Sequence, residues 1–67
     1  MSWATDAAAA LEVAKSDIIA VIAIIDVALP EMEEGTPERE AAEDMRAKMV
    51  AALAVVNATL LIVTPFA

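Results

Sequence analysis

Two long segments of the chain carry apolar residues at helical spacing, and a short polar stretch separates them. In the first segment an apolar residue recurs every three or four positions, at Leu11, Ala14, Ile18, Val21, Ile25 and Ala28. This spacing is typical of one face of an α-helix that packs on another helix. Two-residue alternation, which would indicate a strand, fails at Ile18-Ile19 and Ile24-Ile25. We therefore expect a first helix over about residues 4–29.

The polar stretch contains signals for one helix end and one helix start. Pro30 disfavours helix at the residue before it and lacks an N–H, so the first helix either stops there or kinks and continues to about residue 34. Gly35 suits the position after a helix C-terminus, Thr36 suits an N-cap and Pro37 suits the first helical position. The sequence thus predicts a turn over about residues 30–36 and a second helix over about residues 37–64.

Two helices of similar length joined by a tight turn form an antiparallel hairpin. We therefore expect an all-α protein in which residues 1–67 make one domain. The predicted intrachain seam consists of Leu11, Ala14, Ile18, Val21, Ile22 and Ile25 in the first helix and Met45, Met49, Leu53, Val56 and Leu60 in the second.

Each helix also has a second apolar surface, which the hairpin seam cannot cover. At about 100° per residue, apolar residues of the first helix gather opposite the seam, and the outer side of the second helix becomes apolar from Val50 onward. A helix that is apolar on nearly all sides lies inside a protein assembly or a bilayer. The predicted subunit interface consists of Val13, Ala20, Ile24 and Val27 in the first helix and Val50, Ala54, Leu61 and Ile62 in the second.

These opposed faces favour a helical-bundle homo-oligomer. Closed cyclic assemblies dominate among homo-oligomers, and two faces would give each hairpin a neighbour on both sides. We therefore expect three or more copies rather than a dimer. Hydrophobic residues make up 61% of the chain, which supports burial of additional surface beyond one seam.

Charge narrows the range of partners. The net charge is −7, from eleven acids and four bases, which is the wrong sign for nucleic acid or an anionic membrane surface. We expect the chain itself to be the partner. The first ten residues have no secretory pattern because no Lys or Arg precedes their apolar part, and no location is predicted beyond the cytoplasm of an expressing bacterium.

Few residues are candidates for chemistry. The chain has no His and no Cys, and its Ser and Thr hydroxyls have no base to activate them, so we expect no enzyme, cofactor or metal. Asp26 lies among Ile24, Ile25 and Val27. It either sits on a polar flank beside Glu12 and Lys15, the interpretation we favour, or is a buried carboxylate with a raised pKa.

Other polar and sulfur-containing residues have a structural interpretation beside a functional one. The acidic set Glu31, Glu33, Glu34, Glu38, Glu40, Glu43 and Asp44 fits a solvated cap better than a Ca²⁺ or Mg²⁺ site. Met32, Met45 and Met49 fit core filling better than a peptide-binding groove. Asn57 is either a surface residue or a buried amide that fixes register between subunits.

The G-T-P-E-R-E junction, the Ala-rich helices, the matched helix lengths and the absence of His and Cys resemble de novo designed symmetric helical homo-oligomers. In such a protein Trp3, within the initial MSW, would be an added absorbance label. The resemblance implies that assembly itself is the function.

The alternative is a membrane-embedded hairpin with Asp26 as an ion or proton site, which resembles the proton-carrying ring subunit of rotary ATP synthases. This chain departs from that family, because its carboxylate lies on the first helix and its loop is acidic. The first helix also lacks the uncharged span of about 20 residues that crosses a bilayer, so we expect no membrane location.

Overall fold

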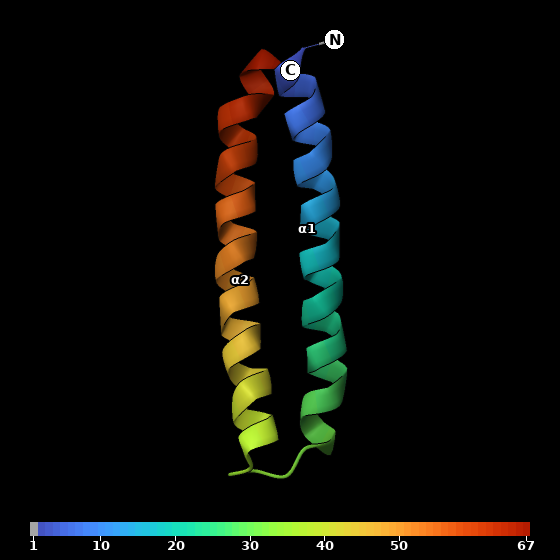
Figure 1. Ribbon diagram of the computed structural model, residues 1–67, viewed down its shortest axis with the longest axis vertical. Coiled ribbons are helices and arrows are strands. Elements are labelled where there is room, and N and C mark those ends of the chain that lie inside the picture. Colours follow the sequence, from blue (N-terminus) through green and yellow to red (C-terminus); the bar gives the residue numbers. More distant parts are fainter. Residues whose placement is uncertain (1) are drawn as a thin grey trace.

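The computed structural model describes residues 2–67, which form two long antiparallel helices side by side (Figure 1). Helix α1 spans Trp3–Ala28 and is followed by the short 3-10 helix η1, Leu29–Glu31; helix α2 spans Pro37–Val63 and is followed by the 3-10 helix η2, Thr64–Phe66. The described residues contain no strand. The expected all-α fold with two packed helices is confirmed, and the hairpin measures 49 × 14 × 12 Å.

Helix α1 ends before Pro30 and does not continue through it. Leu29, Pro30 and Glu31 make a single 3-10 turn, and Met32 is then extended, with φ −92° and ψ 137°. The alternative of a kinked helix that runs to about residue 34 is therefore wrong. Proline removes a backbone donor and crowds the preceding turn, so the chain leaves the helical path here.

The start of α2 follows the local sequence signals. The Thr36 hydroxyl accepts a hydrogen bond from the Arg39 backbone N–H at 3.3 Å and donates one to the Glu33 carbonyl at 2.7 Å. Pro37 occupies the first turn, where a missing N–H leaves no bond unmade. Gly35 has φ +77°, in the left-handed region that glycine enters without a Cβ clash.

The interior between the helices is small. Among the described residues only Ala4, Ile25 and Val63 are buried. The radius of gyration is 15.4 Å, whereas a compact chain of this length has about 11 Å. The accessible surface of 4718 Å² also exceeds the roughly 4,000 Å² of a compact protein of this mass. The hairpin is a rod with one shared face, not a globule.

Ten of the eleven predicted seam residues are buried or half-buried, and Met45 is the exception. Its side chain is 52% exposed, while the neighbouring Arg46 is half-buried. The guanidinium of Arg46 reaches across to the Asp26 carboxylate on α1. Near the loop, an ion pair therefore bridges the two helices at the level where the spacing predicted methionine packing.

Candidate assembly surface

The outer face of α1 is apolar and open to solvent. All four α1 residues predicted for the subunit interface are exposed. The side chains of Val13, Ile24 and Val27 are 62%, 68% and 78% exposed. Ile24 is thus exposed and the adjacent Ile25 is buried, because successive helical residues differ by about 100° in direction. Neighbouring isoleucines therefore belong to different faces of one helix.

The outer face of α2 has the same character over its C-terminal half. All four predicted interface residues there are exposed, including Leu61 and Ile62. Val55, which the predicted set omitted, is also exposed on this helix. The structure thus leaves both outer faces open. The two predicted halves of the interface lie on different helices, α1 and α2.

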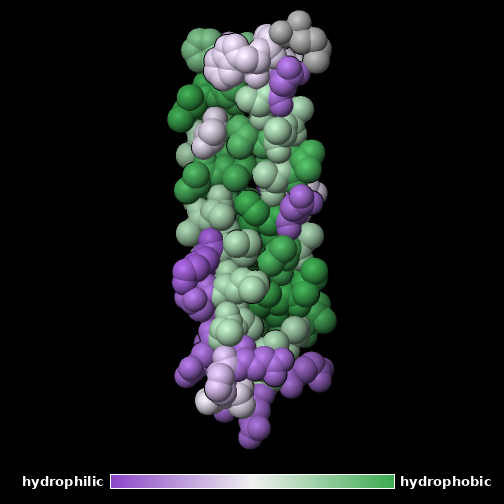
Figure 2. All heavy atoms as spheres, in the orientation of Figure 1, coloured by the Kyte–Doolittle hydropathy of each residue, from purple (hydrophilic) through white to green (hydrophobic). Residues whose placement is uncertain are grey.

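Charged residues gather at the loop end of the hairpin. Hydrophilic side chains concentrate around the turn in Figure 2, and apolar side chains occupy most of the shaft above it. Eight of the eleven acids and three of the four bases lie between Asp26 and Lys48. The outer face of α2 beyond Lys48 can therefore become buried without removing a charged side chain from water.

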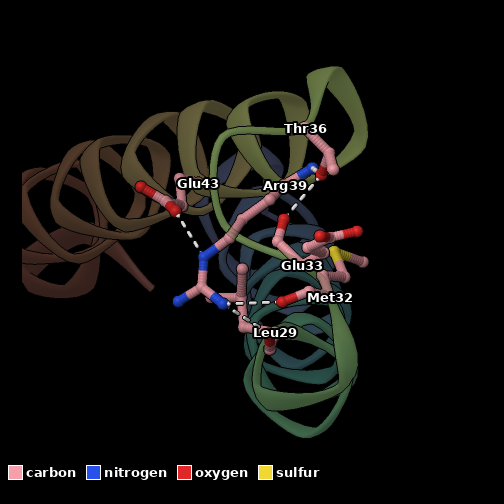
Figure 3. Close-up of polar contacts among 6 residues, drawn as sticks. All are labelled: Leu29, Met32, Glu33, Thr36, Arg39 and Glu43. Atoms are coloured by element: carbon pink, nitrogen blue, oxygen red, sulfur yellow. Dashed lines mark hydrogen bonds and ion pairs between the residues drawn. The ribbon is translucent and has the colours of Figure 1, made fainter.

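Arg39 organises the loop end through contacts that helical spacing did not reveal (Figure 3). The Nη1 amino group of the guanidinium donates to the backbone carbonyls of both Leu29 and Met32 at 3.0 Å. The Nε–H donates to Glu43 at 2.9 Å, a pair that its i,i+4 spacing does indicate. One side chain of α2 thereby ties the end of η1 to the second helix. The only sequence signal for the contacts with Leu29 and Met32 is the presence of an arginine in the first turn of the second helix.

Asp26 lies on a polar flank and forms a cross-helix ion pair. Arg46 donates to it from Nε at 2.6 Å and from a terminal nitrogen at 3.3 Å. Hydrogen bonding to Arg46 is the main cause that lowers the pKa of Asp26, and the same bond raises the pKa of Arg46. A proton-carrying carboxylate in an apolar site would instead have a raised pKa. The Asp26–Arg46 ion pair therefore links the two helices.

The opposite end of the hairpin is closed by apolar groups. Ala4 and Val63 are buried there, and the rings of Trp3 and Phe66 stack with centroids 6.4 Å apart. The interpretation of Trp3 as an absorbance label does not predict this contact. The burial of Ala4 does have a signal in the sequence, because Ala4 lies two helical turns, or seven residues, before the seam residue Leu11.

The remaining candidates for chemistry come together in no site. Within residues 2–67 there is no pocket and no group of three or more acidic, His or Cys side chains that could hold a metal ion. Asn57 is exposed on α2, while Met32 and Met49 are half-buried. The exposed apolar faces are therefore the features on which a functional proposal can rest.

The cross-helix contacts define which parts of the two helices lie at the same level. Asp26 meets Arg46 near the loop, and Trp3 meets Phe66 at the other end. For two residues that face each other across the hairpin, the residue numbers therefore add up to about 70. The uncharged part of α2 beyond Lys48 thus lies beside the part of α1 that carries Asp6, Glu12, Lys15 and Asp17.

Helix α2 with η2, Pro37–Phe66, is long and apolar enough to cross a membrane, judged by length and composition alone. Searches against protein-family models, curated proteins and solved structures found no match to the chain.

Proposed function

We propose that this chain is a structural subunit that assembles with copies of itself and has no catalytic activity. One observation carries the proposal: eleven large apolar side chains are exposed among the described residues, while only three residues are buried. Folded monomers seldom leave such large continuous apolar surfaces in water. Association of the outer faces would remove this surface from water.

A second copy is the partner that the chain itself supplies. Both outer faces expose mainly aliphatic and alanine side chains, so each resembles the other in chemistry. Homo-oligomers with closed symmetry are the commonest soluble assemblies, so we propose a closed one. The acidic loop end, left in water, would keep such an assembly soluble.

A bilayer-inserted hairpin is the second candidate, favoured by the length and composition of Pro37–Phe66. The position of charged α1 residues beside the uncharged part of α2 argues against this candidate. A hydrocarbon layer that covers residues 49–66 of α2 would also enclose Asp6, Glu12, Lys15 and Asp17 of α1. Each ionised side chain at the centre of a bilayer costs about 2.5 kcal/mol or more.

Solution mass in buffer without detergent is the primary test. Light scattering behind a sizing column should give a defined multiple of the 7.0 kDa chain. A monodisperse monomer would refute self-assembly. A chain that dissolves only in detergent would favour the bilayer candidate.

A matched pair of adjacent substitutions tests which surface assembles. Ile24→Glu places a carboxylate on the exposed outer face of α1, and Ile25→Glu places it in the buried seam. A buried unpaired charge costs several kcal/mol, and an Ile24→Glu subunit escapes that cost by dissociating.

We expect Ile24→Glu to give smaller species that retain helical circular dichroism. Ile25→Glu should lose helix content as well as assembly, because dissociation does not expose the hairpin seam to water. If Ile24→Glu keeps the parent mass, the outer face of α1 is not an interface.

A further inference from the structure

The outer face of α1 is lined mainly by small and aliphatic side chains. Its exposed residues near the centre of the face include Ala9, Val13, Ser16, Ala20, Ala23, Ile24 and Val27. Like any helical face, it repeats every three or four residues in both directions along the helix. A surface with this property can meet a copy of itself turned by 180° about a perpendicular axis.

We propose that two hairpins pack through this face with their α1 helices antiparallel, about a two-fold axis between the levels of Ser16 and Ala20. The inference rests on the proposed self-assembly and specifies its geometry. The loops of such a pair point in opposite directions, whereas in a ring of parallel hairpins all loops would point the same way.

The side-chain sizes fit this antiparallel arrangement. Ala9 lies at the level of the partner's Val27, and Val13 lies at the level of the partner's Ile24. At the axis, Ser16 meets the partner's Ala20, so only small side chains separate the two backbones. Large residues meet smaller ones at both ends, which lets the helices approach closely and interdigitate.

A parallel ring would fit the same surfaces less well. Copies related by rotation about the long axis have no freedom to slide, so facing residues of α1 and the next α2 would again add up to about 70. Ile24 and Val27, both exposed, would then lie at the levels of Arg46 and Glu43 on the neighbouring α2. Apolar side chains would face the charged third of α2.

Charge also favours the antiparallel pair. The segment from Asp26 to Lys48 holds eight acids and three bases, so each loop end is strongly acidic. A parallel ring brings these ends together, within the screening distance of about 10 Å at 0.1 M salt. Antiparallel packing places them at opposite ends of the assembly, where they hardly interact.

Distance between loop labels tests the geometry directly. The chain has no Cys, so Glu34→Cys gives one spin label per subunit, on the exposed turn. At 1.5 Å per residue from the axis, labels in an antiparallel pair lie about 45 Å apart. In a parallel ring, labels on neighbours lie roughly 10–20 Å apart, because packed helix axes are about 8–10 Å apart.

Pulsed electron resonance on the labelled assembly should therefore show a distance near the longer value, which neighbours in a parallel ring do not give. An assembled protein with only the short distance would overturn the antiparallel pair and leave self-assembly intact. A monomer by light scattering would instead refute the proposed self-assembly itself, so the two failures are distinguishable.

Assembly mass is a second readout of the same proposal. Two-fold pairing through α1 uses one outer face, and the outer face of α2 remains to join pairs. The mass should therefore be an even multiple of 7.0 kDa. A stable trimer would overturn the inference.

Two Ala→Glu substitutions, one at the proposed interface and one away from it, test the position of the axis. Ala20→Glu puts two carboxylates next to the axis, whereas Ala41→Glu makes the same change at an exposed position in the charged part of α2. We expect the dissociation constant to rise at least tenfold for Ala20→Glu and less than twofold for Ala41→Glu. Equal effects, or none at Ala20, would contradict the assigned face.

A substitution at Asp17 should strengthen association rather than weaken it. Asp17 is exposed at the edge of this face, close to the level of the axis, so the pairing brings it near the partner's Asp17. Asp17→Asn removes this like-charge repulsion and should lower the dissociation constant several-fold at low salt. Unchanged or weaker association would place Asp17 away from the axis and overturn the proposed register.

Discussion

The two ends of the hairpin are closed by different kinds of interaction. At the loop end, Arg39 donates to two backbone carbonyls and to Glu43, and Thr36 caps α2. At the terminal end, Ala4 and Val63 are buried and Trp3 stacks on Phe66. Directed hydrogen bonds fix one end, and non-directional apolar contact closes the other.

This difference suggests a division of structural roles between the two ends of the hairpin. Hydrogen bonds have strict geometry, so the loop end sets the angle and the register at which the helices begin to pack. Apolar contacts tolerate small displacements, so the terminal end adds stability without defining the register. The following substitutions test that division, all compared at one protein concentration because assembly changes apparent stability.

Removing the Arg39 contacts should have the largest effect. Arg39→Ala removes the side-chain donor to the carbonyls of Leu29 and Met32, although the Met32 N–H still donates to Leu29. The substitution should lower the free energy of unfolding by about 2 kcal/mol. Urea denaturation followed by circular dichroism measures the change. Glu43→Gln is the control and should lower the same quantity by less than about 0.5 kcal/mol, since it weakens only an i,i+4 pair.

Truncation at the terminal end should have a somewhat smaller effect. Val63→Ala removes two buried carbon atoms and should lower the free energy of unfolding by about 1.5 kcal/mol. Leu61→Ala on the exposed face is the control, measured in the Ile24→Glu background to limit assembly. Equal losses for both substitutions would show that Val63 is not part of the interior.

The helix caps permit a direct comparison of the two ends. Thr36→Ala should lower the free energy of unfolding by about 1 kcal/mol, because the cap both bonds the Arg39 N–H and holds the turn. Ser2→Ala removes the cap of α1, whose hydroxyl accepts from the Thr5 N–H. Its loss should be smaller, because only the first turn can fray. A larger loss at Ser2 would reverse the proposed division.

The smallest effect is expected from the Asp26–Arg46 ion pair, and it should depend on pH. Arg46 lowers the folded-state pKa of Asp26 below its ordinary value of 3.8. The ionised carboxylate therefore adds stability above that value, and the addition disappears as pH falls through the lower folded value. Asp26→Asn should melt slightly below the parent at neutral pH. The difference should vanish in strong acid, and a difference that persists there would exclude the ion pair as its cause.

Local features of the chain were predictable from the sequence, because short-range physics determines them. Helix period, the Thr36 cap, Pro37 at the first turn and the stop near Pro30 all depend on residues a few positions apart. The choice between stopping at Pro30 and kinking through it remained open, because both satisfy the local rules.

Features that depend on the exact rotation of one helix against the other were not predictable. Helical spacing placed Met45 in the seam, but Arg46 occupies that side and leaves Met45 exposed. Arg39 reaches carbonyls seven and ten residues away, which a flexible side chain can do only once the turn has its shape. The predicted interface residues are exposed, and their contacts with other copies stay a prediction.

The Trp3–Phe66 stack gives the protein an internal optical reporter. Trp3 is the only tryptophan, and its ring partner is the only phenylalanine, with no tyrosine to add background emission. Because Trp3 is already 69% exposed, separation of the two rings would change its emission mainly through loss of the contact with Phe66. Comparison of that signal with far-ultraviolet dichroism during unfolding would show whether the rod opens first at its terminal end.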